Sequence, residues 1–226
     1  MSDRKDQGSA VAVLASGGIE SAAMLTEAIS RYERVYPIYV RKGLQWEVAE
    51  LISLRRLLRS FQTDGLAPLT VLEVPLGPIY GHHWSLGKAA TPDERAPDAA
   101  VYLPGRNILL LSLGGLFCSS RKIATLWIGI LKGNPFRDAR AGFVKQVELL
   151  LADALSFPLR IATPMRELSK AEVLSRWPDI RWEKTFSCLR PVNRRHCGRC
   201  QKCAERRQAF REAGIPDPTG YGRRFS

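Results

Sequence analysis

An apolar run followed directly by two glycines is the feature that most limits how this chain can fold. The run spans residues 11–15, and Ser16, Gly17 and Gly18 separate it from a helix-like segment. A β-branched apolar run is typical of a buried strand, and glycine readily adopts the positive φ of a tight turn. Such a turn exposes backbone N–H groups at the positive end of the next helix, where Ser16 and Ser21 can add hydroxyl donors. This arrangement predicts a cradle for phosphate groups.

Residues 16–21 match neither of the two common phosphate-binding fingerprints. The dinucleotide motif needs G-x-G-x-x-G and the Walker loop needs G-K-[ST], and this turn has neither. The segment does resemble the SGGxDS pyrophosphate loop of the N-type ATP pyrophosphatases, with Glu20 in the place of Asp. The resemblance implies an enzyme that splits ATP between its α- and β-phosphates and transfers AMP to a substrate oxygen. A plain strand-to-helix turn is the alternative interpretation.

Further strand-like and helix-like segments alternate along the chain. Strands are expected at residues 34–40, 69–74, 123–130 and 159–162, and helices at residues 44–60, 108–116 and 143–155. Alternating strands and helices favour βαβ units, which build a parallel sheet through right-handed crossovers. The sequence therefore predicts an α/β fold with an open parallel sheet flanked by helices.

Two details of this pattern predict local structure. Pro37 lies inside the second strand, and because proline lacks an N–H it should mark a sheet edge or an early break. In the helix at residues 44–60, apolar residues recur at the spacing of one helix face. That face is expected to be buried and comprises Val48, Leu51, Ile52, Leu54 and Leu58.

Basic residues stand at two later helix starts. Arg106 and Asn107 open an apolar helix, where their side chains offer charged and amide donors. Arg106 is therefore a candidate phosphate ligand, with a solvent-facing position as the alternative. Ser169 and Glu172 have capping-box spacing, which places Lys170 in the first turn of another helix. A cation there opposes the helix dipole, so Lys170 is a further candidate phosphate ligand, with surface placement as the alternative.

Four of the five cysteines lie close together near the carboxyl end of the chain. Cys197, Cys200 and Cys203 are three residues apart, and Cys188 precedes them. Four thiolates can close a tetrahedron around a zinc ion that has a structural role. Disulfides and iron–sulfur ligation are the alternatives, although the spacing matches neither ferredoxin pattern. Cys118 lies in an apolar segment and is expected to be a buried small hydrophobe.

The charge of the chain indicates an anionic partner. The formal net charge is +12, and residues 160–226 hold 16 Lys and Arg against 7 Asp and Glu. This favours a nucleotide, a nucleic acid or a protein partner, with a solvated basic face as the alternative. The longest apolar stretch, residues 108–118, is too short to span a bilayer, and the polar amino-terminal residues do not form a secretory signal. A cytoplasmic protein without a membrane partner is therefore expected.

Taken together, these features resemble the 7-cyano-7-deazaguanine synthase family of queuosine biosynthesis. The resemblance runs in order through residues 16–21, 102–107, 164–174 and 185–188 and the cysteines at 197–203. It implies the Rossmann-like PP-loop fold of the adenine nucleotide alpha hydrolases, with a carboxyl-terminal helical extension that binds zinc. The expected parts are a nucleotide-binding domain at 8–165, a helical zinc-binding segment at 166–216, and a flexible tail at 217–226.

The resemblance also implies an activity and roles for particular residues. The reaction would be ATP-dependent adenylation of 7-carboxy-7-deazaguanine, followed by attack of ammonia or another amine to give an amide and then a nitrile. The resemblance thus implies a carbon–nitrogen ligase that releases AMP and pyrophosphate from ATP and uses Mg²⁺ and a structural Zn²⁺. A homo-oligomer is also expected. ATP binding is assigned to Ser16, Gly17, Gly18, Ile19 and Ser21, and catalysis to Glu20, Arg106 and Lys170.

The chain departs from the family pattern at three places. Glu20 replaces Asp, residues 41–46 lack the Tyr-Gly-Gln and His pattern, and residues 132–140 lack an Asp-Tyr-Ser-Gly-Tyr run that helps to recognise the base. Three other functions therefore stay open. The chain could be a paralogue that joins the activated carboxylate to a macromolecular amine, a tRNA-modifying enzyme such as a thiolase, or a non-enzymatic module that binds nucleic acid or protein.

Overall fold

The computed structural model describes residues 6–222 and shows one five-stranded sheet. Its strands are β1 (Asp6–Leu14), β2 (Tyr32–Arg41), β3 (Thr70–Glu73), β4 (Thr125–Trp127) and β5 (Arg160–Ala162). All four pairings are parallel, and the strand order is β3-β2-β1-β4-β5. The order reverses between β1 and β4, which opens a crevice at the carboxyl ends of these strands. The predicted open parallel α/β sheet is confirmed.

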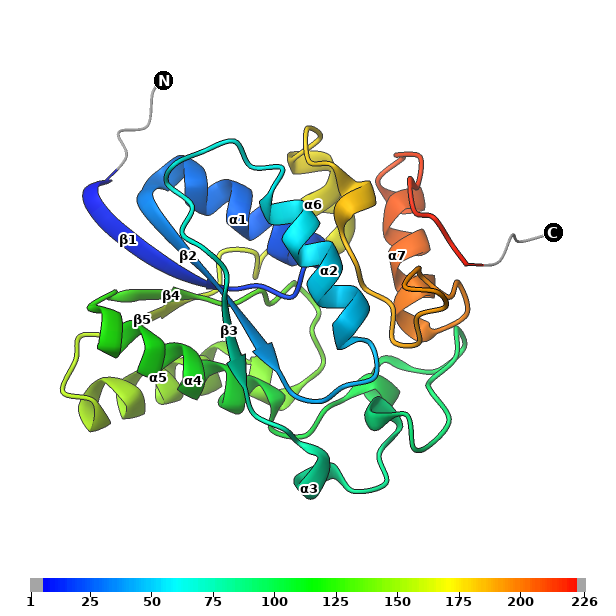
Figure 1. Cartoon of the computed structure of the whole chain (residues 1–226), viewed down its shortest axis with the longest axis horizontal. Helices are drawn as coiled ribbons and strands as arrows, with labels where there is room; N and C mark the ends of the chain where they lie inside the picture. Colours follow the sequence, from blue (N-terminus) through cyan, green and yellow to red (C-terminus); the bar gives the residue numbers. More distant parts are fainter. Residues whose placement is uncertain (1–5, 223–226) are drawn as a thin grey trace.

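Helices cover both faces of the sheet (Figure 1). One face carries α1 (Ile19–Arg31), α2 (Glu47–Leu58), α6 (Lys170–Arg176) and α7 (Gln201–Glu212), and the other carries α4 (Arg106–Arg121) and α5 (Ala141–Ala154). Successive residues of β1 serve opposite faces, as the pleat of a strand requires. Val11 and Val13 pack in the core with α1, whereas Ala12 and Leu14 pack in the core with α4 and α5.

Pro37 lies in the middle of β2, and β2 lies between β1 and β3. The prediction that Pro37 marks an edge or an early break is therefore wrong. The backbone N and C=O of Pro37 point toward the same neighbouring segment as those of Val35, two residues earlier, which is the β3 side of β2. On that side an isolated bridge joins Val35 to Leu66, and the ladder with β3 begins only at Ile38 and Thr70. Proline has no N–H to donate, and at Pro37 none is needed, because the segment before β3 forms no continuous ladder with β2 there.

Helix α2 buries the predicted apolar face except in its first turn, since Leu51 and Leu58 pack against the core around Leu54. Leu54 and Leu57 are buried as core residues, but Val48 is 59% exposed, so its predicted burial is wrong. Glu47 is buried instead, at 3% exposure. The first turn of α2 therefore directs charged side chains inward, toward the carboxyl end of β2.

Short helices occupy the long segment between β3 and α4. They are α3 (Gly77–Tyr80) and two 3₁₀ turns at Trp84–Leu86 and Asp98–Val101. Figure 1 shows α3 at the edge of the molecule, away from the sheet. Among residues 6–222, no helix combines the length and apolar composition needed to cross a bilayer.

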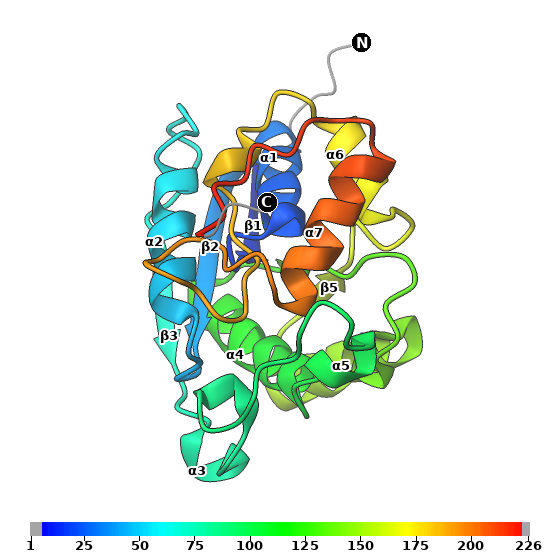
Figure 2. The same ribbon diagram turned by 90° about the vertical axis from the view of Figure 1, so that its right-hand side faces the viewer.

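The carboxyl-terminal segment packs against the same core as α1. Figure 2 shows α7 beside α6, and Phe210 of α7 lies in the core cluster with α1 residues. Arg206, only 1% exposed, donates to Thr185 Oγ1 at 2.8 Å and to the Trp182 carbonyl at 2.9 Å. Arg206 therefore fastens α7 to the preceding loop, while the expected domain boundary at residue 165 stays a prediction.

Part of the expected flexible tail makes contacts with this segment. Arg206 Nε donates to Thr219 Oγ1 at 2.6 Å, and Tyr221 OH donates to Asp217 Oδ2 at 2.6 Å. The backbone N–H of Gly222 donates to the His196 carbonyl at 2.7 Å. Residues 223–226 of the expected tail lie outside the described residues.

Candidate active site and metal centre

A cavity of about 400 Å³ lies at the carboxyl ends of β1, β2 and β4. Open α/β sheets bind ligands at this edge. Six of the residues assigned to ATP binding or catalysis line this cavity: Ser16, Gly18, Glu20, Ser21, Arg106 and Lys170. The structure therefore brings the amino-terminal turn and the starts of α4 and α6 to one place.

The turn at residues 16–21 has the geometry expected of a phosphate cradle. Gly17 has φ +84°, and the backbone N–H of Ser16 donates to Ser21 Oγ at 2.9 Å. Helix α1 begins at Ile19 with Gly18 as its N-cap, and no side chain caps it. The orphan N–H groups of the first helical turn can therefore receive an anion. Gly17 has no side chain and Ile19 does not line the cavity, so these two residues offer only backbone groups to a ligand.

Lys170 lies between two carboxylates on the wall of the cavity. Its Nζ is 3.0 Å from Glu20 Oε1 and 2.6 Å from Glu205 Oε1, so it joins α6 to α1 and α7. Burial acts to raise the pKa of Glu20, but the charge of Lys170 together with hydrogen bonds from Lys170 and the backbone holds that pKa below its ordinary value. Burial acts to lower the pKa of Lys170, but the two carboxylates outweigh it and raise that pKa.

Replacing Lys170 by methionine is expected to destabilise the protein by about 3–5 kcal/mol, because Glu20 and Glu205 would then lose their shared cation. In the wild type, Glu20 titrates below its ordinary pKa of 4.5, so its stabilising contribution is present above that pH and is lost in acid. The difference between wild type and Lys170→Met should therefore be largest near neutral pH and shrink below about pH 4.5. Urea unfolding at several pH values measures it, with the exposed Lys88→Met as control. If Lys170→Met loses no more free energy of unfolding than Lys88→Met, Lys170 does not stabilise the two carboxylates.

A second cluster of polar side chains, which includes Tyr39, Lys42 and Glu50, lines the cavity where β2 ends. Tyr39 OH donates to Glu50 Oε2 at 2.7 Å. The Glu47 carboxylate accepts the backbone N–H groups of Lys42 and Gly43 at 2.6 and 2.9 Å. Lys42 Nζ is 3.7 Å from Glu47 Oε1, and although burial lowers the pKa of Lys42, Glu50 and Glu47 oppose this. Burial raises the pKa of Glu50 to about 7.

Sequence reasoning did not find this second group. Charged residues in the first turn of a helix are typical of a solvated helix end, and the apolar pattern of α2 did not reveal that they are buried. The useful signal is the departure of residues 41–46 from the family pattern, because Lys42 lies within that stretch.

The loop between β4 and α5 forms another wall of the cavity. The backbone N–H of Asn107 donates to Asp138 Oδ2 at 3.1 Å, and Asn107 Nδ2 donates to the Asp138 carbonyl at 3.2 Å. Asp138 thus satisfies an N–H group at the start of α4 and fixes the loop beside Arg106. Residues 132–136 of this loop face the cavity.

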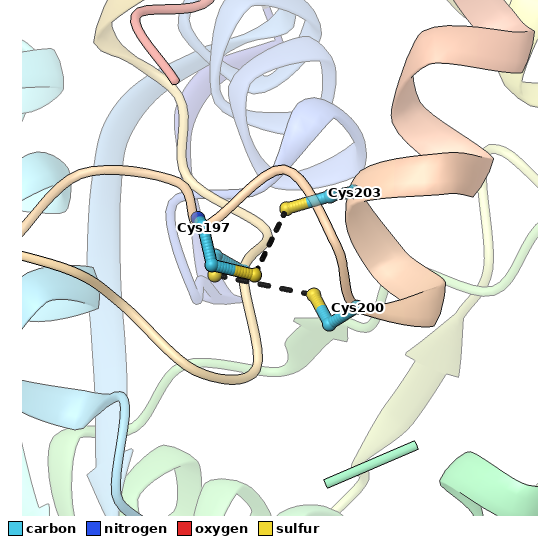
Figure 3. A group of neighbouring side chains, drawn as sticks. Cys197, Cys200 and Cys203 are labelled. Carbon is cyan, nitrogen blue, oxygen red and sulfur yellow. Dashed lines mark hydrogen bonds between the residues drawn. The ribbon is translucent and has the colours of Figure 1, made fainter. Parts of the chain in front are cut away.

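The four predicted cysteines converge, and Cys188 among them lines the cavity. Figure 3 shows the other three, Cys197, Cys200 and Cys203. Their sulfur atoms lie within 4.8 Å of one another, with 4.0 Å between Cys197 and Cys203 and 3.9 Å between Cys188 and Cys200. A disulfide needs about 2.05 Å, so these cysteines are unpaired thiols. Bonds of about 2.3 Å in a tetrahedral zinc site would set the sulfurs about 3.8 Å apart. The four side chains therefore fit a single four-coordinate metal ion.

Backbone groups support the cysteine cluster and connect it to the turn at residues 16–21, called the phosphate turn below. The N–H of Cys197 donates to Cys188 Sγ at 3.2 Å, and the N–H of Leu189 donates to Cys200 Sγ at 3.4 Å. Such donors around the sulfur atoms orient thiolate ligands. The N–H of Phe186, close to Cys188, donates to the Gly17 carbonyl at 2.8 Å. The cysteine cluster can therefore hold the turn at residues 16–21 in place through a short segment.

Comparison with known proteins identifies the family. The family model described as "Queuosine biosynthesis protein QueC" matches residues 10–214. This chain belongs to the QueC family. A 7-cyano-7-deazaguanine synthase from Anaeromyxobacter dehalogenans is 32% identical, covering 93% of this chain and 95% of that protein. A 7-cyano-7-deazaguanine synthase from Azoarcus sp. is 30% identical, covering 92% of this chain and 95% of that protein.

One solved structure resembles this chain in fold. A 4-thiouridine synthetase, solved with RNA and bound ATP, has a TM-score of 0.50 and 15% sequence identity. The match covers 93% of this chain and 52% of that one, and at this identity it shows the fold alone. The QueC relatives are named as synthases, which supports enzymatic activity.

Proposed function

We propose that this chain uses ATP to activate 7-carboxy-7-deazaguanine and then joins the activated carbon to nitrogen. The substrate carboxylate attacks the α-phosphorus of ATP, pyrophosphate leaves, and ammonia or another amine displaces AMP to give the amide. A second ATP then adenylates the amide oxygen with release of pyrophosphate, and AMP leaves with that oxygen while the nitrogen loses two protons, which yields the nitrile. One observation carries the proposal: in a QueC-family chain, the turn at residues 16–21 opens on the same cavity as Arg106 and Lys170.

The ATP site is assigned to Ser16, Gly17, Gly18, Ile19 and Ser21. Backbone N–H groups of the turn and of the first turn of α1 bind the two phosphates that leave as pyrophosphate, and the two hydroxyls supply further donors. The Ser16 and Ser21 hydroxyl oxygens are 3.3 Å apart, close enough to act on one phosphate group. Fixed donors of this kind lower the barrier because they need no rearrangement as charge moves to the leaving group.

The carboxylate and the triphosphate are both anions, so the site needs cations. This role is assigned to Arg106 at the start of α4 and to Lys170 at the start of α6. Glu20 Oε2 lies 3.1 Å from the position of a Cβ atom on Gly18, so a carboxylate lies directly over the turn. Carboxylate and phosphate oxygens are ligands that Mg²⁺ prefers, so Glu20 fits a magnesium ion that enters with ATP. When bound, this ion supplies positive charge to the phosphates.

The four-cysteine cluster is assigned to structural zinc. Four thiolates leave no open coordination position, so the metal holds structure and takes no part in the reaction. A four-iron cluster binds its cysteines to different iron atoms of a larger cage. Sulfur atoms 3.9–4.0 Å apart favour a single ion instead.

A macromolecular amine is the second candidate acceptor. The departures from the family pattern at Glu20, residues 41–46 and residues 132–140 favour it, because the last two line the cavity. A thiolase reaction is less well supported, since Cys118 is buried in the core and burial raises the pKa of its thiol to about 12. The homo-oligomer, the nucleic-acid or protein partner and the non-enzymatic module stay predictions.

An assay of AMP release tests the proposal. Purified protein with Mg²⁺-ATP is expected to form AMP and pyrophosphate only when 7-carboxy-7-deazaguanine is present, and ammonium should then yield the amide or the nitrile. Ser16→Ala should lower AMP release about 10–100-fold because it removes a phosphate donor. Ser30→Ala, at the far end of α1, is the matched control and should have no effect. Formation of ADP instead of AMP would contradict adenylation, and AMP formed without amide or nitrile would favour the macromolecular acceptor.

A further inference from the structure

The part of the cavity near the end of β2 differs in chemistry from the phosphate turn. It has apolar and aromatic walls made by Leu44, Trp46, Val101, Leu103 and Phe186. Trp46 stacks on Trp84 with 5.7 Å between ring centroids and an interplanar angle of 20°. The stacked partner fixes the orientation of the Trp46 ring. Rigid apolar walls of this kind suit a planar heterocycle.

Glu50 contributes a carboxylate to this part of the cavity. Its Oε2 accepts the hydrogen bond from Tyr39 OH, and within residues 9–222 it forms no ion pair. The other oxygen, Oε1, therefore has no hydrogen-bond partner in the part of the chain that the structure describes. Glu50 also lies close to the phosphate turn, because Leu54, one helical turn later in α2, would be 3.1 Å from a Cβ atom on Gly17.

We propose that Glu50 binds the N–H edge of the substrate base, formed by the ring N1–H and the exocyclic 2-amino group of 7-deazaguanine. This inference rests on the proposed function and names the group that selects its base. A carboxylate offers two acceptor oxygens in one plane, which match two parallel N–H donors. The corresponding edge of adenine offers one donor and one acceptor, so the base of ATP matches this carboxylate less well.

The charges around Glu50 agree with this role. Tyr39 and Lys42 face it from the end of β2, Glu47 from α2 and Arg106 from α4. Burial and Glu47 raise the pKa of Glu50 to about 7, against the lowering effects of Lys42, Tyr39 and Arg106. N–H donors from a base stabilise the ionised carboxylate. Affinity for the base is therefore expected to fall as the pH drops below about 7, because a protonated Glu50 has lost one acceptor.

Calorimetric binding of 7-deazaguanine to the full-length protein tests this proposal without requiring turnover. Glu50→Gln is expected to weaken binding about 100-fold, since two hydrogen bonds to a charged group are weakened or lost. An analogue without the 2-amino group should bind wild type much more weakly, but Glu50→Gln should lower its affinity by less than about threefold. This non-additivity identifies the contact between Glu50 and the 2-amino group. Glu73→Gln, an exposed residue of β3, is the control for loss of a carboxylate.

Tyr39→Phe provides a second variant that leaves the carboxylate in place. It removes the hydrogen bond that favours the ionised form, so the pH midpoint of base binding should rise. Unchanged base affinity in Glu50→Gln, an unchanged midpoint in Tyr39→Phe, or a loss of ATP affinity in place of base affinity would each overturn the proposal. If wild type binds 7-deazaguanine but releases no AMP, the proposed reaction fails while this site stands. Failure to bind the base at all would overturn both.

Discussion

Replacing Gly17 by alanine is expected to lower carboxylate-dependent AMP release about 100-fold or more. Gly17 has φ +84°, which costs an alanine about 1–2 kcal/mol. The added Cβ would also lie 3.1 Å from Leu54 Cβ and 3.2 Å from Leu54 Cα, and the second of these atoms belongs to the backbone of α2. Because α2 cannot yield easily, the turn must move. Such a movement misplaces the N–H groups that are proposed to hold the phosphates.

Gly214→Ala is the matched control for this substitution. Gly214 also has a positive φ, +67°, but no atom lies within 4 Å of its added Cβ. The control should therefore lose about 1–2 kcal/mol of stability through backbone strain and keep its AMP release. Steady-state rates of AMP formation, thermal unfolding and metal content measure the difference. Gly17→Ala with wild-type AMP release would show that the phosphates bind elsewhere.

The phosphate turn and the cysteine cluster could be predicted because each carries its signal in a short stretch of chain. Residues 16–21 contain the whole turn, including the two hydroxyls that meet in the structure. Cys197, Cys200 and Cys203 are spaced so that one loop and the start of α7 bring them together. The parallel sheet was predictable for a similar reason, since each strand and helix carries its own hydrophobic period.

The base-facing wall of the cavity could not be predicted because it depends on several elements at once. Glu50 comes from α2, its partner Tyr39 comes from β2, and Arg106 comes from α4. No local pattern in α2 shows that these two other elements leave Glu50 half-buried. The apolar pattern even assigned Val48 to the buried face, where Glu47 lies instead. Pro37 gives the same lesson, since its place in β2 depends on where β3 begins to pair.

Removing the metal is expected to have the largest effect on stability. Cys200→Ala should abolish metal binding and cost about 5 kcal/mol or more, a fall of roughly 10–20 °C in Tm. The physical reason is that four thiolates, which converge around a shared ion, otherwise repel one another or take up protons. Because the Phe186 N–H binds the Gly17 carbonyl, disorder around Cys188 should reach the phosphate turn and lower AMP release as well.

Cys118→Ala separates this effect from the loss of any buried cysteine. Cys118 lies on α4 and is fully buried in the core that α4 shares with the sheet. Its replacement should therefore lower the free energy of unfolding by about 1–2 kcal/mol through lost packing. Metal content, measured by atomic emission, and AMP release should stay at wild-type values in this control. Chelation of wild type should reproduce Cys200→Ala, and added zinc should restore both Tm and activity. A chelated wild-type protein that keeps its Tm would show that the cysteine cluster does not depend on a metal, and the link from metal centre to phosphate turn would fail with it.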